Sequence, residues 1–405
     1  MRRLAALATS ACLIILPVSA QPAGADRLAT AAQLRDAALA GNKAWGLLSS
    51  LTDTVGQRLA GTEAEARGRA WAKTEMQKLG LVNIREEAFP LTVWERGQAS
   101  ATIVGSNHQL ALAALGTSGA TPAGGITAPV TCFSNLAAFR AAPDAAVKGR
   151  IIFVDHRMGV TQDGSSYGVN GAVRRAAPAL GAQKGAAAVL IRSLGTDYHR
   201  NPHTGGTVFP AGTAAIPALA LALPDAELLA RRCAAGPVQM QLVSTPSSKP
   251  GQSANVTAEI PGTVPGEVVV LGGHLDSWDL GQGVFDDGAG VAISLATAGA
   301  IKAYVDRSGQ RPRRTIRVVL WGAEGRSAGF SVLSSSAMVS AFTPGLSLAR
   351  PTSARPRLVP SSRTIAVIAP PGQLRVCRHC VGTGATGPSA NVARQAARGS
   401  PSTWA

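Results

Sequence analysis

A strand–helix–strand unit between residues 267 and 321 most strongly limits what this chain can fold into. The run 267–272 is mostly Val and Leu, the run 288–302 is rich in Ala, and the run 315–321 is again apolar. Strands that are apolar on both faces lie in a sheet covered on both sides. Because such a connection makes its two strands parallel, we expect an α/β fold with functional residues at the carboxyl ends of the strands.

The residues before this unit fall into two parts. Residues 26–104 are predicted to be the N-terminal part of the domain that contains the strand–helix–strand unit. They include a helix over 64–79 that ends at Gly80 and alternating strands over 84–104. Residues 105–250 instead mix short apolar strands with short helices, which predicts a separate small α/β unit.

A polar run over 245–253, which contains Pro250 and Gly251, is typical of a linker. We expect it to lead from the small unit into residues 251–324, which contain the strand–helix–strand unit.

Polar side chains suited to metal chemistry follow each predicted strand. His274 comes directly after the first strand, Asp286 and Asp287 stand where the helix begins, and Glu324 follows the second strand. Zinc hydrolases need nitrogen and oxygen ligands and a carboxylate that takes a proton from bound water. We expect these groups to meet at one sheet edge, where Asp276 can orient the His274 ring. A carboxylate at the helix start can bridge two cations about 3.5–4 Å apart.

Each of these residues alone has a simpler interpretation. A single His usually belongs to the core or the surface, and an Asp before a helix usually caps its N-terminus. The succession of three strand-end motifs in order favours a site over these separate explanations.

The motifs resemble those of a family of two-zinc exopeptidases, which includes bacterial leucyl aminopeptidases, glutamate carboxypeptidase II and the carboxypeptidase Q type. The resemblance is greatest to the last type and covers about residues 30–324. It is carried by Gly-His-Leu-Asp-Ser-Trp at 273–278, by Asp-Asp-Gly at 286–288, and by Gly-Gln-Arg-Leu at 56–59. It implies a mixed sheet flanked by helices, with a protease-associated insert domain over 105–250.

The resemblance also implies roles for the site residues. His274 matches a ligand of one zinc ion, which Asp276 orients, and Asp286 matches a carboxylate that bridges two zinc ions through a cis peptide to Asp287. Glu324 matches the general base that deprotonates the bridging water. The implied substrates are dipeptides or short peptides, and the implied assembly is a homodimer. The next family ligand is a Glu, but this chain has Gly325 at that position.

The composition changes abruptly at the same point. Residues 325–405 contain no Asp, Glu or Lys, nine Arg, and a single His at position 379. The later acidic ligand and His of the family therefore have no clear counterpart, and we expect the C-terminal part of the catalytic sheet to be missing. The tail is either genuinely divergent or an out-of-frame translation, and its lack of acids favours the second explanation. We expect a disordered tail and an inactive, truncated copy of the enzyme.

The N-terminus and the charge distribution bear on location and partners. Arg2 and Arg3, a short apolar run and small residues near position 25 predict a signal peptide over 1–25, and hence a secreted or periplasmic protein. The apolar run is too short for a stable membrane span. The formal charge is +16, but no basic stripe is interleaved with aromatic residues, so we do not expect nucleic-acid binding.

Four of the five cysteines lie beyond the predicted signal. Cys132 and Cys233 can pair in an oxidising compartment. The run 377–380, Cys-Arg-His-Cys, has zinc-ligand spacing but no partner pair, so chance explains it better.

The sequence therefore predicts a secreted or periplasmic zinc metallopeptidase whose site is incomplete in this copy. Two alternatives stay open: a non-catalytic remnant whose insert domain acts as an interaction module, and an aminopeptidase of the same family.

Overall fold

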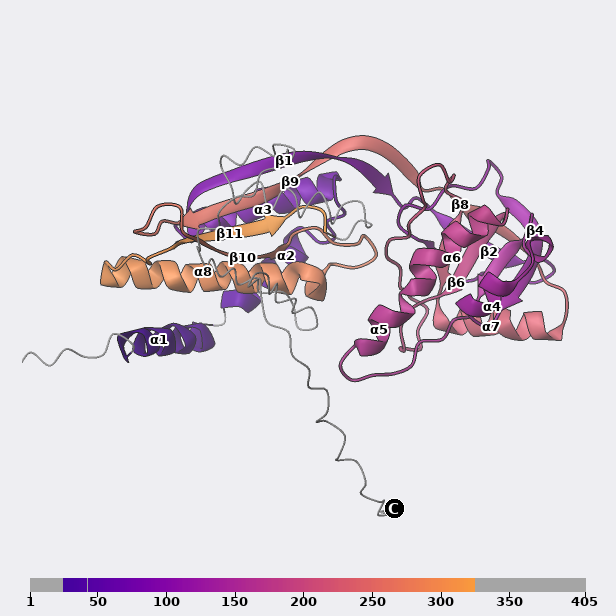
Figure 1. The fold of residues 1–405 in the computed structure, drawn as a ribbon, viewed down its shortest axis with the longest axis horizontal. Coiled ribbons are helices and arrows are strands. Elements are labelled where there is room, and N and C mark those ends of the chain that lie inside the picture. The colour runs from indigo at the N-terminus through magenta and orange to yellow at the C-terminus, as the bar shows by residue number, and fades with distance from the viewer. Residues whose placement is uncertain (1–24, 42, 325–405) are drawn as a thin grey trace, which may run out of the picture.

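The structure is a computed structural model that describes residues 25–41 and 43–324 (Figure 1). Residues 1–24 of the predicted signal peptide and the predicted aberrant tail, with Gly325 and the 377–380 cluster, lie outside the described residues. The described chain forms two lobes, each built around its own β-sheet with helices against it. The predicted α/β fold with a mixed sheet is confirmed.

The first lobe contains a four-stranded mixed sheet. Its strands, in spatial order, are β1 (Val82–Glu95), β9 (Ser247–Ile260), β11 (Thr315–Trp321) and β10 (Val268–His274). Strands β10 and β11 are parallel, whereas β9 is antiparallel to both β11 and β1. The predicted strand–helix–strand unit therefore exists, with α8 (Ala289–Ser308) as its crossover helix.

Three helices from the N-terminal part complete this lobe: α1 (Ala25–Gly41), α2 (Lys43–Thr54) and α3 (Glu63–Lys78). Helix α3 begins at Thr62, whose Oγ1 accepts a hydrogen bond from the Glu65 N–H, while Glu65 Oε2 accepts one from the Gly61 N–H over 2.7 Å. It ends before Gly80, which has a φ of +71°. Buried side chains from α2, α3, α8 and the sheet form one core, which includes Leu51, Met76, Val256, Leu295 and Leu320.

The linker predicted over 245–253 is wrong, because β9 already begins at Ser247. It pairs with β1 in a long antiparallel ribbon in which Trp94 is opposite Ser248 and Pro90 is opposite Gln252. Polar residues with a Pro and a Gly look like a linker in the sequence alone. Here they form the exposed end of a strand whose partner lies far away in the chain.

The second lobe contains a seven-stranded sheet. Its strands, in spatial order, are β2 (Ala99–Ile103), β8 (Gln239–Ser244), β4 (Ile126–Phe133), β5 (Ile151–Val154), β6 (Ala188–Arg192), β7 (Ala218–Leu221) and β3 (Leu112–Ala114). The central strands β4 to β7 are parallel. The helical segments are α4 (Leu136–Ala141), η1 (Asp144–Ala146), α5 (Ser165–Asn170), α6 (Ala172–Gln183) and α7 (Leu223–Ala235).

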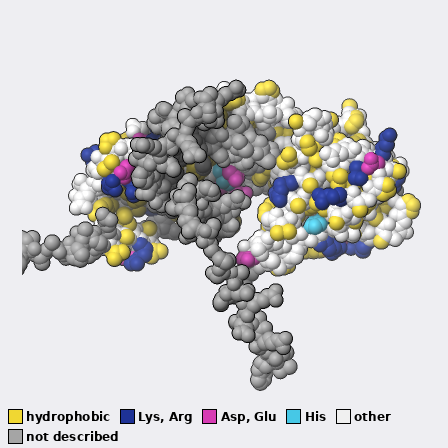
Figure 2. All heavy atoms as spheres, in the orientation of Figure 1, with side chains coloured by type: hydrophobic (Ala, Val, Ile, Leu, Met, Phe, Trp, Pro, Cys, Tyr) yellow, Lys and Arg dark blue, Asp and Glu magenta, His cyan; other side chains and the backbone are white. Residues whose placement is uncertain are grey.

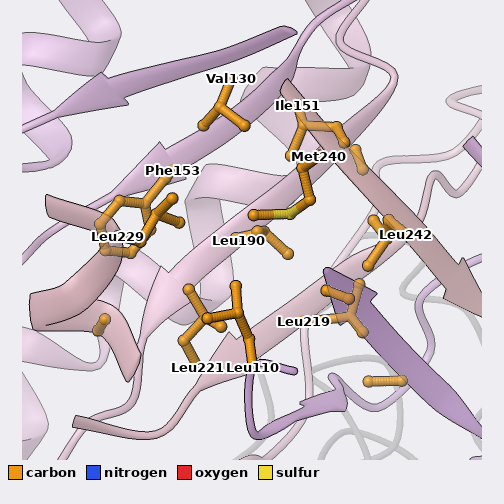
Figure 3. Close-up of a cluster of buried hydrophobic side chains, with 14 of the residues drawn as sticks. Leu110, Val130, Ile151, Phe153, Leu190, Leu219, Leu221, Leu229, Met240 and Leu242 are labelled. Atoms are coloured by element: carbon orange, nitrogen blue, oxygen red, sulfur yellow. The ribbon is translucent and has the colours of Figure 1, made fainter. Parts of the chain in front are cut away.

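The second lobe has two buried clusters, one between the sheet and α7 and another between the sheet and the helices α4 and α6. Figure 3 shows part of the first cluster, where Ile151, Leu190, Leu219 and Met240 from four strands gather with Leu229 of α7. Cys132 and Cys233 form a disulfide that joins β4 to α7. Hydrophobic, charged and uncharged side chains are intermixed on the face of this lobe shown in Figure 2.

The two lobes meet at a joint around Arg96. Its guanidinium forms a fork with the Asp279 carboxylate, Nε to Oδ2 over 2.8 Å and Nη2 to Oδ1 over 2.5 Å. It lies 5.1 Å from the ring centre of Trp94 and 5.7 Å from that of Trp278, and it also donates to the Ala114 carbonyl. Since Asp279 and Trp278 follow the end of β10, this joint connects the second lobe to the loop behind the candidate site.

The chain enters and leaves the second lobe at one place. The Gln98 N–H donates to Thr245 Oγ1 over 2.9 Å, and the Thr245 N–H donates to the Gln98 carbonyl over 2.9 Å. Residues that flank the whole lobe in the sequence are therefore hydrogen-bonded neighbours.

One segment of the described chain, Val284–Ser308, has the length and composition of a membrane span. It comprises the single-turn π-helix η2 (Val284–Gly288) and α8. Val291, Leu295 and Ala298 of α8 are buried in the core of the first lobe. Helices in soluble cores meet the same length and composition criteria.

Candidate metal centre

The parallel pair β10 and β11 brings the predicted site residues to one edge of the sheet. His274 is the last residue of β10 and is in register with Trp321, the last residue of β11. The Leu275 N–H donates to the Trp321 carbonyl over 2.6 Å, which extends the pairing past the strand end. Glu324 follows three residues after Trp321, so it lies at the same edge.

His274 is held through both ring nitrogens. Its Nδ1 lies 2.9 Å from the Asp276 carbonyl and 3.3 Å from Asp276 Oδ1. Because a carbonyl only accepts, Nδ1 carries a proton and donates to it. Its Nε2 lies 2.8 Å from Asp286 Oδ1. The ring of His274 is therefore oriented by Asp276, and its second nitrogen faces the Asp286 carboxylate.

The charges around His274 set its protonation state. Burial lowers the pKa of His274, but hydrogen bonds and charges from Asp276 and Asp286 outweigh burial and raise it well above 6.5. The hydrogen bond from His274 in turn lowers the pKa of Asp286, against the effect of its own partial burial. In the metal-free protein, His274 and Asp286 therefore form an ion pair, in which Nε2–H donates to the carboxylate.

Asp287 has a different role from Asp286. Its Oδ2 accepts a hydrogen bond from the His274 N–H over 3.1 Å, and its Oδ1 accepts one from the Gly290 N–H over 3.1 Å. The helix-capping interpretation considered for Asp286 thus applies to Asp287, which is buried and ties the end of β10 to the start of α8. The peptide bond between the two aspartates is cis, as the family resemblance implies.

Glu324 reaches the same edge through its backbone and its side chain. Its N–H donates to Asp276 Oδ1 over 3.0 Å, and its Oε2 lies 3.8 Å from His274 Nε2. Burial raises the pKa of Glu324, and the negative charges of Asp276, Asp286 and Asp287 add to the rise, although His274 opposes it. A carboxylate with a raised pKa suits proton transfer.

The turn that carries Glu324 is fixed by side chains of β9. The Gly322 N–H donates to Asn255 Oδ1 over 3.1 Å, and the Gly322 carbonyl accepts from Ser253 Oγ over 3.0 Å. Ser253 Oγ also lies 2.7 Å from Oε1 of the buried Glu65. Nothing in the sequence indicates that Glu65, Ser253 and Asn255 meet at this turn, because the pairing register of β9 cannot be read from a single sequence.

The described residues form only part of a zinc site. Imidazole nitrogen and carboxylate oxygen are donors that zinc accepts, and His274 Nε2 and Asp286 Oδ1 face each other. Protein zinc sites, however, use three or four protein ligands. Within residues 25–41 and 43–324, no group of three or more His, Cys, Asp or Glu side chains is placed to hold a metal ion. The donor set therefore fits zinc in kind but not in number.

A cavity of about 400 Å³ lies beside the joint between the lobes and not at His274. The residues around it are Gln57, Leu59, Thr62, Glu63, Ala64, Arg67, Glu95, Arg96, Gly97 and Asp279. It is therefore separate from the cluster of His274, Asp286 and Glu324.

Known proteins resemble both the sequence and the fold. The profile of peptidase family M28 matches residues 255–349. Carboxypeptidase Q of Bos taurus is 37% identical over 290 residues, which cover 70% of this chain and 58% of that relative. Carboxypeptidase Q of Mus musculus is 36% identical over 287 residues, which cover 70% of this chain and 59% of that relative. The chain thus spans less than two thirds of the length of these curated relatives.

The solved structures agree with the sequence relatives. The crystal structure of a peptidase M28 precursor from Shewanella amazonensis has a TM-score of 0.72 and 36% identity, covering 78% of this chain and 72% of that chain. A zinc aminopeptidase from Bacillus subtilis has a TM-score of 0.50 at 22% identity, covering 70% of this chain and 61% of that chain, and supports the fold alone. The chain belongs to peptidase family M28.

Proposed function

We propose that this chain has the scaffold of a zinc-dependent exopeptidase for dipeptides or short peptides, and that the chain with this sequence does not hydrolyse them. The observation that carries the proposal is the ion pair between His274 and Asp286 beside Glu324, at the carboxyl edge of β10 and β11. This arrangement has the donors of a zinc hydrolase but too few of them for tight zinc binding.

Family membership supports the kind of chemistry. Zinc would supply a water of lowered pKa, and His274 and Asp286 are the described residues able to hold the metal. The raised pKa of Glu324 fits a general base, and Asp276 orients His274. Without a complete set of ligands, these residues hold a proton between them and activate no nucleophile.

The sequence beyond the described residues supports the loss of activity. Gly325 follows Glu324 where the family resemblance implies a Glu ligand, and no Asp or Glu occurs from there to residue 405. Neither the missing ligand nor a later acidic ligand can therefore come from this part of the chain. Sequencing the gene across codon 325 tests an out-of-frame origin, which requires an acidic, His-containing continuation in another frame.

Metal analysis and an activity assay test the proposal directly. The purified chain should hold less than one tightly bound zinc ion after dialysis and should cleave dipeptides and aminoacyl substrates no faster than a buffer blank. Glu324→Gln serves as the matched control, because it keeps the shape of the side chain and removes the base. Two bound zinc ions, with hydrolysis that Glu324→Gln abolishes, would refute the proposal. Preference for aminoacyl substrates in that case would identify an aminopeptidase.

Export from the cytoplasm forms part of the proposal. The disulfide between Cys132 and Cys233 supports an oxidising compartment, since such bonds are rare in the cytosol. The signal-like residues 1–25 support the same location. Intact-mass measurement on protein from culture medium or periplasm should show a chain that begins near Gln21 or Asp26. A mass that retains Met1 would contradict export by cleavage.

A further inference from the structure

Arg58 is a fully buried cation near the site, and the proposed chemistry gives it no role. Its side chain is fully buried, and none of the described carboxylates forms an ion pair with it. Its guanidinium instead donates to backbone carbonyls of the loop between β10 and η2. Nε bonds to Leu275 over 2.6 Å, Nη1 to Gln282 over 2.8 Å and Nη2 to Gly283 over 3.1 Å.

The backbone of Arg58 also contacts the first part of the same loop, at Ser277. Its N–H donates to Ser277 Oγ over 3.0 Å, and its carbonyl accepts from the Ser277 N–H over 3.0 Å. Arg58 therefore binds both ends of this loop, at Leu275 and Ser277 and at Gln282 and Gly283. The loop carries Asp276 in its first half and leads directly into Asp286. The backbone carbonyl of Asp276 and the carboxylate of Asp286 hold the His274 ring.

The energetics of this burial suggest a purpose beyond packing. Burial lowers the pKa of Arg58 to about 10, while the charges of Asp276 and Asp287 partly compensate. A buried cation with its bonds spread over backbone carbonyls is costly unless every donor is used. The planar fork of an Arg satisfies several carbonyls in fixed directions, which neither Lys nor an apolar side chain can do.

We propose that Arg58 is a positioning residue, which fixes the 275–283 loop so that His274, Asp276 and Asp286 are arranged before any metal arrives. This inference rests on the proposed function, because it concerns the geometry of the partial zinc site. It predicts that the loop is ordered in metal-free protein and loosens when the guanidinium is removed.

Hydrogen–deuterium exchange of metal-free protein in chelator tests this inference without using activity. Arg58→Met keeps an apolar stem of similar length, and Arg58→Lys keeps the charge but loses the fork. Arg67→Met is the matched control on the exposed face of α3. In Arg58→Met, exchange over residues 275–288 should rise about tenfold or more, while β5 and β6 exchange as in wild type. Arg58→Lys should lie between, and Arg67→Met should match wild type.

A folded Arg58→Met with wild-type exchange over 275–288 would overturn the inference. If Arg58→Met unfolds throughout, Arg58→Lys decides the question. A rise in exchange confined to 275–288 supports positioning, and a uniform rise in exchange or no rise refutes it.

Zinc competition with a chromophoric chelator adds a functional readout, in which Arg58→Lys should bind zinc about 10–100-fold more weakly than Arg67→Met. Equal zinc affinity in these two variants would refute positioning. If wild type binds no measurable zinc, the proposed loss of the zinc site is supported, and hydrogen–deuterium exchange then decides the role of Arg58 by the criteria above.

Discussion

The Glu324 N–H donates a hydrogen bond to Asp276 Oδ1 over 3.0 Å, which joins two motifs that lie far apart in the sequence. Asp276 thus contacts residues at the ends of both β10 and β11. Its carbonyl accepts a hydrogen bond from the His274 ring, and its carboxylate holds the turn after β11. This single buried residue therefore links the predicted ligand to the predicted base through its carbonyl and its carboxylate.

Replacing Arg96 should lower the free energy of unfolding, because Arg96 stabilises the joint between the lobes. Arg96→Met leaves the Asp279 carboxylate, which is largely buried, without its forked partner. Breaking one side of a buried ion pair typically costs about 3–5 kcal/mol. Urea unfolding followed by tryptophan fluorescence should show this loss, since Trp94 and Trp278 flank the guanidinium. A loss like that of a surface Arg, tested with Arg85→Met, would contradict a tight joint.

Gly116 should tolerate no side chain, because the ring of Trp278 occupies the space beside it. A Cβ at Gly116 would lie 2.3 Å from the ring, whereas one at Gly159 would meet nothing within 4 Å. Gly116→Ala should therefore destabilise the protein by about 1–3 kcal/mol, as overpacking does. Thermal unfolding of Gly116→Ala beside Gly159→Ala measures the difference. Equal midpoints for the two variants would argue against this packing.

Breaking the disulfide should destabilise the second lobe. Cys132 and Cys233 are 101 residues apart in the sequence, so the bond restricts a long loop in the unfolded chain. Removing such a bond typically costs about 2–4 kcal/mol. Cys132→Ser with Cys233→Ser should lower the unfolding midpoint, and exchange should increase in β4 to β7 more than in β10 and β11. An unchanged midpoint after full reduction would contradict this expectation.

Glu65 should make stability depend on pH in an unusual direction for a carboxylate. Burial raises the pKa of Glu65 above 4.5, although hydrogen bonds from Ser253 and Arg69 oppose the rise. The folded state therefore holds this proton more tightly than the unfolded state. The contribution of Glu65 to stability is greatest below pH 4.5 and is lost as pH rises through the raised pKa.

Urea titrations of wild type and Glu65→Gln at pH 4.5 and pH 7.5 check this expectation. The Gln variant stays neutral, so its stability relative to wild type should improve between the lower and the higher pH. A relative stability that worsens with rising pH would mean that the ionised carboxylate is favoured in the fold.

The local pattern of apolar and polar residues was sufficient to predict the helices and strands that bury one continuous apolar face. The helix expected over 64–79 is α3 at Glu63–Lys78, and the strand expected over 315–321 is β11. Helix α8 runs past the expected end at Lys302 because Lys302 pairs with Asp306 one turn later and Gly309 ends the helix with a φ of +69°. The expected end at Lys302 was therefore too early, because Val305, one turn before Gly309, still packs against the core of the first lobe.

Contacts between distant segments could not be predicted in the same way. The sequence placed His274, Asp286 and Glu324 at one sheet edge, because parallel strands end together, and the structure brings them together. Ser253 and Asn255 lie in a run that resembles a linker, and only the register of β9 against β11 brings them to Gly322. Non-local pairing of this kind leaves no period in a single sequence.

The contact between Gln98 and Thr245 has a consequence for how such a chain can evolve. A whole lobe is attached at two backbone points that are already one hydrogen bond apart. A tight turn could join β1 to β9 directly without changing their register, in which Glu95 is opposite Ser247. Gain or loss of the lobe would then need one genetic event at a hairpin tip, and the four-stranded sheet would retain its own core.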